Sequence, residues 1–326
     1  MNNKIIVVLY SEAKRKYFST EEHYKTELEV FPRSKVVKKE IEKLGYKVIL
    51  LPGNANSLIK LKKIKPLLVF NLVDSVFGKE ELIQIIPATL DLFTIPYTGT
   101  DAIGLSINSS KFLTKAILNQ SGIPQPKFQL FTNKNIRLDN SLKFPLIVKL
   151  NESHGSLEIN QDSVVESENK LRNRVGFLID KYHQSVIIEE YIRGKEITVL
   201  MIEDKEESII LAEERIFFKK EKYPLYSYEA AWGEKEIYDC ISYKLNEKIK
   251  EDVRKAFKIL QFKDYARFEL IIDKNGNHFF IDPNANPSFG PYGTTSGPFG
   301  YLLFLNKIRF VSIVKKIINN VSRRFK

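Results

Sequence analysis

Two acidic residues stand on either side of an Asn-Gly pair in the stretch RFELIIDKNGNHFFIDPNANP, which covers residues 267–287. The runs FELII and FFI are typical of β-strands, and Asn275-Gly276 is a preferred two-residue hairpin loop because both residues tolerate a positive φ. A hairpin closed by this loop places Glu269 directly opposite Asp282. The spacing therefore predicts two carboxylates side by side.

The same register divides the hairpin into two faces, because side chains of a strand alternate between its sides. The expected polar face carries four residues: Arg267, Glu269, Asp282 and Asn284. The expected core face carries five residues: Phe268, Leu270, Ile272, Phe279 and Ile281. The hairpin should therefore present its polar groups as one cluster.

Directly opposed side chains lie roughly 5 Å apart at Cβ, and two carboxylates at that distance favour a bound cation or a shared proton. Mg²⁺ prefers hard oxygen ligands and is usually held by one or two carboxylates together with substrate phosphates. Glu269 and Asp282, with the amide oxygen of Asn284, therefore suit magnesium. The alternative is an exposed hairpin whose charges are solvated.

A magnesium–phosphate site also needs cationic side chains and backbone N–H donors. The sequence has no GxxxxGK[ST] loop and no GxGxxG fingerprint. Lys149 ends the strand-like run FPLIVKL, and Lys111 lies near the start of a predicted helix. A turn containing His154, Gly155 and Ser156 follows Lys149. These residues can surround a polyphosphate, although a surface hairpin and a surface lysine explain the pattern equally well.

Three acids surround a predicted strand break in IIEEYIRGKEITV, namely Glu189, Glu190 and Glu196. Carboxylates at such a break can accept hydrogen bonds from an adenine amine and from ribose hydroxyls, or they can face solvent. The sequence contains no HExxH, CxxC or GxSxG motif, so classical zinc and serine-hydrolase chemistry lacks support.

The composition indicates a folded protein of two or three units, with 326 residues of which 43% are hydrophobic. The single cysteine excludes an intrachain disulfide framework and fits a reducing compartment, so we expect a cytoplasmic protein. No apolar run is long enough to span a bilayer. The net charge of +11 permits a nucleic-acid partner, but the lysines are spread along the chain, which favours a solvated surface.

Strand-like runs at 4–10, 46–51 and 67–73 alternate with helical patterns at 34–44 and 57–64. This alternation indicates an α/β unit with a parallel sheet, which we expect to end near residue 100.

A helix is predicted over 108–121, with Asn108 as its N-cap and Gly122 as its stop. A basic amphipathic helix is predicted at the C-terminus, where the apolar residues Ile308, Val311, Val314, Ile317, Ile318 and Val321 form one stripe. We expect this helix to pack on the protein; the alternative is a membrane-surface helix.

Taken in order, four stretches resemble the ATP-grasp superfamily, and most of all its D-alanine–D-alanine ligase-like branch. The stretches are PYTGTDAIGLSINSSKFLTKAILNQSGIPQPKFQLF, FPLIVKLNESHGS, IIEEYIRGKEITVLMI and YARFELIIDKNGNHFFIDPNANP, within residues 96–287. The last is the most specific, because the family carries Arg-x-acid and, thirteen residues after that acid, a second acid followed by x-Asn. The resemblance implies an α/β fold with three parts: a Rossmann-like pre-grasp domain (1–100), a small grasp lobe (101–187) and a large grasp lobe (188–326).

The resemblance also implies the cofactors ATP and Mg²⁺, with two ions that Mn²⁺ can replace, and small-molecule acid and amine substrates. It assigns ATP contacts to Lys111, Lys149, Gly155, Ser156, Glu189, Glu190, Tyr191, Ile192 and Glu196. It assigns metal binding to Glu269, Asp282 and Asn284. By the same resemblance Lys149 and Arg267 are catalytic, with Arg267 stabilising the transferring phosphoryl group, and a homodimer is expected.

Several positions depart from the family pattern. The family acid at position 282 is more often Glu, and Ala231 in YSYEAAW stands where D-alanine–D-alanine ligases carry a lysine, a role left to Lys219, Lys220 or Lys222. The Gly-Gly segment after the first strand and the His-Gly segment after the third are absent. We therefore expect a substrate other than D-alanine; Asn71 and Glu80 are candidates for a changed substrate site or for structural roles.

The leading hypothesis is an ATP- and Mg²⁺-dependent ligase that joins a carboxylate to an amine through an acyl phosphate. Positioning and electrostatics suffice for this chemistry, which matches the lack of a nucleophilic triad. Two alternatives remain: a phosphotransferase on the same scaffold, and a non-catalytic module that binds ATP or nucleic acid.

Overall fold

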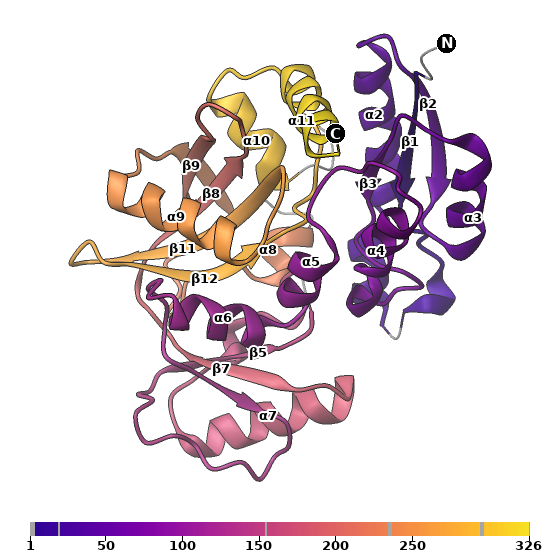
Figure 1. The fold of residues 1–326 in the computed structure, drawn as a ribbon. Helices are drawn as coiled ribbons and strands as arrows, with labels where there is room; N and C mark the ends of the chain where they lie inside the picture. The colour runs from indigo at the N-terminus through magenta and orange to yellow at the C-terminus, as the bar shows by residue number, and fades with distance from the viewer. Residues whose placement is uncertain (1–3, 19, 154, 234–236, 294–296, 326) are drawn as a thin grey trace.

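The computed structural model describes residues 4–18, 20–153, 155–233, 237–293 and 297–325. Three β-sheets organise these residues, and each forms the centre of one part of the molecule in Figure 1. The N-terminal part lies on the right of that view. The part around β5, β7 and α7 lies at the bottom, and the part around β8 and β11 lies on the left.

The N-terminal sheet is parallel and has the strand order β2-β1-β3. Its strands are β1 (Ile5–Tyr10), β2 (Lys47–Pro52) and β3 (Leu68–Leu72). Its helices are α1 (Glu21–Glu27), α2 (Val30–Glu42), α3 (Ala55–Ile64) and α4 (Ile85–Leu92), with 3-10 turns at Arg15–Tyr17 and Glu80–Leu82. The apolar runs that predicted buried parallel strands are confirmed, since Ile6, Val7, Val8 and Leu9 are all fully buried.

A four-stranded antiparallel sheet follows, in the order β4-β7-β5-β6. Its strands are β4 (Phe128–Phe131), β5 (Leu146–Leu150), β6 (Val164–Val165) and β7 (Val186–Glu190), with a 3-10 turn at Gln161–Ser163. Helix α7 (Glu168–Tyr182) packs on this sheet through Leu171, Val175 and Leu178, and Ser167 caps its start.

The third sheet is antiparallel and has the order β10-β9-β8-β11-β12. Its strands are β8 (Gly194–Ile202), β9 (Ile209–Phe217), β10 (Tyr238–Ser242), β11 (Tyr265–Asp273) and β12 (His278–Asn284). Helix α9 (Glu247–Ile259) covers one face, and α8 (Tyr228–Trp232) lies in the connection from β9 to β10.

The helix predicted over 108–121 is instead two helices, α5 (Ala102–Asn108) and α6 (Lys111–Gln120). Asn108 is therefore not an N-cap; Ser110 caps α6 by accepting a hydrogen bond from the Leu113 N–H at 3.3 Å. The stop at Gly122 is confirmed, because this glycine adopts a φ of +72° after the helix.

The amide of Asn108 has a different role, because it is buried against the end of β12. It donates to the carbonyl of Pro283 and accepts from the N–H of Ala285, both at 2.8 Å. The Asn108 side chain therefore holds the backbone groups directly before and directly after Asn284.

The two C-terminal helices are α10 (Gly297–Leu305) and α11 (Phe310–Arg324). The packed arrangement of α11 is confirmed, because Ile317 and Val321 are fully buried in one core with Ile6 and Val37 of the N-terminal part. Figure 1 shows α11 beside α2. Among the described residues, no helix is long and apolar enough to cross a membrane.

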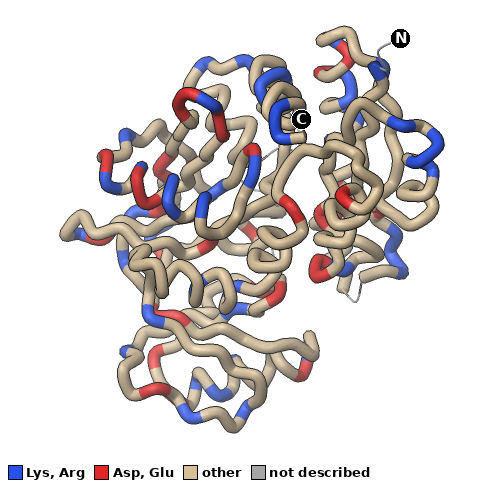
Figure 2. Tube along the Cα trace, in the orientation of Figure 1, with Lys and Arg blue, Asp and Glu red and all other residues tan. Residues whose placement is uncertain are grey.

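Figure 2 places the lysines and arginines over all three parts of the molecule, interspersed with acidic residues. This distribution favours the expected solvated surface over a dedicated nucleic-acid face. For the domain limits, we propose the expected three parts with one adjustment. Strand β7 runs through the expected limit at 187 and pairs within the four-stranded sheet, so the limit belongs after Glu190.

Candidate active site

The hairpin of β11 and β12 pairs Arg267 with Asn284 and Glu269 with Asp282, as the sequence predicted. The loop is different, because Asp273 pairs with Asn277 through a backbone bond of 2.9 Å and three residues, 274–276, form the turn. A register shift next to Glu269 compensates for the additional loop residue. The predicted polar pairs are thus correct, although the predicted two-residue loop is not.

The register shift changes the apolar face of β12. Phe268, Leu270 and Ile272 lie in the core as predicted, but their partner from β12 is Phe280. The placement of Phe279 and Ile281 in the core was wrong, because both are only partly buried. Ile281 instead lines the cleft beside the polar cluster. The pattern of the sequence alone does not reveal a bulge.

Glu269 lies in the centre of the polar cluster and is 7% exposed. Its Oε1 lies 3.0 Å from Nε of Arg267, and its Oε2 accepts a hydrogen bond of 2.8 Å from Thr198. The Asn284 side-chain oxygen accepts from the N–H of Asn286 at 2.8 Å. Two opposed carboxylates and an amide oxygen form a hard-oxygen donor set, which fits Mg²⁺.

Among the described residues, no group of three or more His, Cys, Asp and Glu side chains could hold a metal. The third oxygen ligand of this donor set is an amide, and Mg²⁺ usually completes its coordination with water and substrate phosphates.

Two lysines approach the polar cluster from the four-stranded sheet and from α6. Lys149 lies on β5, and Lys111 is the first residue of α6, where its ammonium donates to the carbonyl of Ser153. Both lysines line a cavity of about 100 Å³, which we call the phosphate cavity, together with Glu269 and Asp282. The structure therefore brings together lysines and carboxylates that the sequence places more than a hundred residues apart.

The turn after Lys149 forms one wall of this region. Gly155 and Ser156 adopt φ values of +66° and +56°, so the backbone turns tightly, and Ser156 lines the phosphate cavity. The carbonyl of Gly155 accepts a hydrogen bond of 2.9 Å from the indole of Trp232. His154, which belongs to the same predicted loop, lies outside the described residues.

The remaining predicted ATP residues line a neighbouring cavity of about 480 Å³, which we call the nucleotide cavity. Its lining includes Lys149, Glu189, Glu190, Tyr191, Ile192 and Glu196. Tyr191 donates from its hydroxyl to the carbonyl of Pro224 at 3.0 Å, which connects this wall to the segment after β9. Glu190 accepts a hydrogen bond of 3.0 Å from the N–H of Lys143, in the segment that leads into β5.

Glu189 is fully buried and lies between two ammonium groups. Its carboxylate lies 3.1 Å from Lys115 and 3.3 Å from Lys149. Burial opposes the charge of Glu189, but the two lysines outweigh burial and hold the pKa of this carboxyl below its ordinary value.

Arg215 of β9 forms part of the floor of the site. Its guanidinium donates to Glu196 at 2.7 Å, approaches Glu269 at 3.8 Å and stacks over the ring of Tyr226. Burial disfavours this cation, but Glu269 and Glu196 outweigh burial and raise its pKa. Arg215 therefore stays charged and lies between the carboxylates of Glu196 and Glu269.

The N-terminal part closes the other side of the polar cluster. A cavity of about 190 Å³, the substrate cavity, is lined by Glu27, Arg33 and Asp74 as well as by Arg267 and Asn284. Arg33 and Asp74 form an ion pair, and Asn286 donates to Asp74 at 2.8 Å. Burial and the charge of Asp74 raise the pKa of Glu27 to about 8, and the Oε2 of Glu27 has no hydrogen-bond partner among the described atoms.

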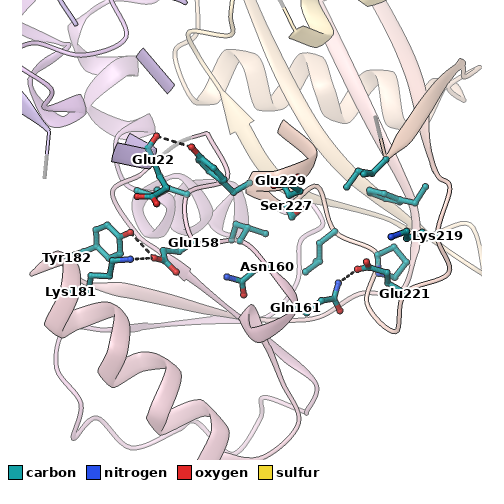
Figure 3. Close-up of a pocket in the computed structure, with 17 residues that line it drawn as sticks. Glu22, Glu158, Asn160, Gln161, Lys181, Tyr182, Lys219, Glu221, Ser227 and Glu229 are labelled. Atoms are coloured by element: carbon teal, nitrogen blue, oxygen red, sulfur yellow. Dashed lines mark hydrogen bonds and ion pairs between the residues drawn. The ribbon is translucent and has the colours of Figure 1, made fainter. Parts of the chain in front are cut away.

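A larger cavity of about 610 Å³ lies between residues 157–161, Lys181 and Tyr182 and the segment from 219 to 229 (Figure 3). Two of its carboxylates already have partners in its lining: Glu158 accepts hydrogen bonds from Lys181 and Tyr182, and Glu221 accepts one from Gln161. It contains none of the predicted metal ligands or phosphate lysines. Size alone therefore does not identify the reactive site in this molecule.

Sequence reasoning missed Lys115, Arg215 and Glu27. Lys115 follows Lys111 by four residues, and this helical spacing puts both on one side of α6, so a signal was present. Arg215 and Glu27 lie in charged segments without any distinguishing pattern. Their importance results from burial, which only the folded chain reveals.

Comparison with known proteins identifies the family of the chain. Residues 117–319 match the family model described as D-ala D-ala ligase C-terminus. The chain is 31% identical to the D-alanine--D-alanine ligase of Aquifex aeolicus, over 78% of this chain and 83% of that protein. It is 30% identical to the corresponding ligase of Pelagibacter ubique, over 78% and 81%.

The solved structure of a D-alanine--D-alanine ligase from Bacillus anthracis, complexed with ATP, has the same fold, with a TM-score of 0.71, 19% identity and 98% coverage of both chains. The VanG D-Ala:D-Ser ligase from Enterococcus faecalis is similar, with a TM-score of 0.70 at 17% identity, over 98% of this chain and all of that one. A cleft between two antiparallel sheets, with lysines on one wall and carboxylates on the other, defines the class of ATP-grasp enzymes. Within that class, the chain belongs to the D-alanine–D-alanine ligase family, whose members are ATP-dependent carboxylate–amine ligases.

Proposed function

We propose that this enzyme uses magnesium-bound ATP to activate a carboxylate as an acyl phosphate, which an amine then attacks to form an amide. The observation that carries this proposal is the phosphate cavity, in which Lys111 and Lys149 face Glu269 and Asp282. Magnesium held by Glu269, Asp282 and Asn284 would neutralise charge on the phosphate oxygens. Catalysis then depends on positioning and electrostatics.

The residues of the chain divide the work between them. Lys111 and Lys149 would bind the phosphates, Arg267 would stabilise the transferring phosphoryl group and the tetrahedral oxyanion, and the nucleotide cavity would hold adenosine. Ala231 supplies no cation from the segment after β9. Lys219 and Lys220 line the nucleotide cavity and can fill that role, whereas Lys222 pairs with Glu166.

We further propose that the acid substrate carries an amine and is not D-alanine. Glu27 faces the substrate cavity with a buried carboxyl whose raised pKa would fall on contact with an ammonium group. Beside it, the Arg33–Asp74 ion pair brings charge to the wall where the His-Gly segment of the family would lie. A polar amino acid or a short peptide fits this wall better than the methyl group of alanine.

The test is release of ADP and phosphate from Mg²⁺-ATP with pools of amino acids, dipeptides and hydroxy acids, combined with mass analysis of the products. The proposal expects substrate-dependent ADP release and a product equal in mass to both substrates minus water. ADP release with a phosphorylated product would indicate a phosphotransferase. If D-alanine were the preferred acid, the proposed specificity would be wrong, but the proposed ligase reaction would stand.

Two variants that replace a carboxylate by a neutral amide test the metal assignment. Glu269→Gln and Asp282→Asn should reduce turnover by roughly 10² or more, because each removes charge that stabilises the transition state. Chelation with EDTA should stop the wild-type enzyme, and added Mg²⁺ should restore it. Glu206→Gln, on an exposed loop, is the matched control and should keep wild-type turnover. Normal turnover in either site variant would refute the metal assignment.

A further inference from the structure

An ion triad of Lys115, Glu189 and Lys149 lies at the wall of the nucleotide cavity, and its three members differ in their access to that cavity. Glu189 is 0% exposed and Lys115 is 1% exposed. Lys149 lines both the nucleotide cavity and the phosphate cavity, whereas Lys115 lines neither of them. One buried carboxylate is thus shared between an inner lysine and a lysine at the cleft.

Lys115 is fixed where the two grasp sheets meet. Its ammonium lies 3.1 Å from Glu189 of β7 and donates to the carbonyl of Phe280 on β12 at 3.4 Å. Phe280 precedes the metal-side Asp282 by two residues. Lys115 therefore connects the adenosine-binding strand to the strand that carries the carboxylates.

The charges of the triad predict what happens when a polyphosphate arrives. Free of ligand, Glu189 has two cationic partners at 3.1 and 3.3 Å. The phosphates of ATP attract Lys149, which alone of the two lysines lines the cavities. A buried carboxylate without a counterion is strongly unfavourable and would take up a proton instead. Lys115 stays beside Glu189 as a counterion, so Glu189 does not need to take up a proton.

We propose that Lys115 is a positioning residue for the nucleotide: it keeps Glu189 ionised and oriented while Lys149 turns to the phosphates. This role rests on the proposed function, because it requires ATP in the nucleotide cavity. Lys115 need not touch ATP itself. It acts through Glu189 and Lys149, and so adds a third lysine to the two that the sequence singled out.

The direct test is the number of protons taken up when ATP binds, measured by calorimetry in buffers of different ionisation enthalpy. In Lys115→Met, Glu189 loses its remaining counterion as Lys149 leaves, so binding should take up about one more proton than in the wild type. Affinity for ATP relative to the wild type should then weaken about tenfold for each unit of rising pH between the free and bound pKa values of Glu189.

Two further variants isolate the charge from the packing. Lys115→Arg keeps a cation and should restore the wild-type proton count. In a Glu189→Gln background the carboxylate is gone, so adding Lys115→Met should change ATP affinity less than threefold. This double variant contains no unpaired buried charge and keeps the test decisive even where Lys115→Met alone does not fold.

Each outcome has a distinct meaning. The inference is overturned if folded Lys115→Met binds ATP with the affinity and proton count of the wild type. It is equally overturned if Lys115→Met weakens binding as much in the Glu189→Gln background as alone, since the lysine would then act by packing. A wild-type protein that binds no ATP at all would refute the proposed function instead.

Discussion

Glu27 is a single buried residue whose negative charge is unfavourable in the free protein. It is 4% exposed, its Oε2 has no hydrogen-bond partner among the described atoms, and Asp74 repels its charge. The pKa of Glu27 is therefore raised to about 8. A carboxyl with a raised pKa stabilises the fold at low pH and loses that contribution as the pH rises toward 8.

Glu27→Gln should separate stability from function. The neutral amide avoids a buried charge, so the free energy of unfolding at pH 8 should rise by roughly 1–2 kcal/mol, while at pH 4 it should hardly change. The Michaelis constant for the amine-bearing acid should increase at least tenfold, with little change in ATP affinity. Urea unfolding at both pH values and steady-state kinetics measure these effects, and a uniform stability change at both pH values would contradict them.

At the scale of elements, the hairpin shows what the sequence can and cannot predict. The Asn-Gly loop predicted Glu269 opposite Asp282, and this pairing is confirmed because the register shift beside Glu269 compensates for the additional loop residue. The three-residue loop and the register shift were not predictable, since Asn-Gly suits several hairpin loops and a bulge leaves no pattern in the residue types. The lysines were predicted as candidates, but only the folded chain, in which α6, β5 and the hairpin line one cavity, explains why they meet the carboxylates.

The contacts of Asn108 at the end of β12 lead to a prediction about how α5 supports that strand. Asn108→Ala would leave the carbonyl of Pro283 and the N–H of Ala285 without partners, which should cost about 1–3 kcal/mol of stability. Because Asn284 lies between those two groups, the affinity for Mg²⁺-ATP should also fall. Ser106→Ala, an exposed change on the same helix, is the control for urea unfolding and should change stability by less than about 0.5 kcal/mol. Unchanged stability in Asn108→Ala would contradict a stabilising role for the two hydrogen bonds of Asn108.

Across the whole molecule, the N-terminal part and the C-terminal helices form one core, so neither end of the chain packs independently. Polar contacts join the same regions. Asp264 accepts from the Gly99 N–H at 2.7 Å and lies 3.3 Å from Arg324 of α11. Arg324 also donates to the carbonyl of Tyr97. Burial raises the pKa of Asp264 to about 6, although Arg324 partly offsets the effect.

Arg324→Ala should weaken this connection in a pH-dependent way. Without Arg324, the pKa of Asp264 rises further, so stability should fall as the pH rises from 4 to 7, with a loss of about 2–4 kcal/mol at neutral pH. Thermal unfolding across that pH range measures the effect. Arg323→Ala, an exposed neighbour on the same helix, is the control. A loss that is equal at every pH would show that Asp264 is not involved.

The bond between the Trp232 indole and the Gly155 carbonyl has a practical consequence. Trp232 is the only tryptophan in the chain, so light absorbed near 295 nm excites a single site in the whole protein. That site lies where the segment after β9 meets the turn that follows Lys149. The unmodified enzyme thus contains its own optical reporter, and the emission of one indole reports on the contact between these two segments.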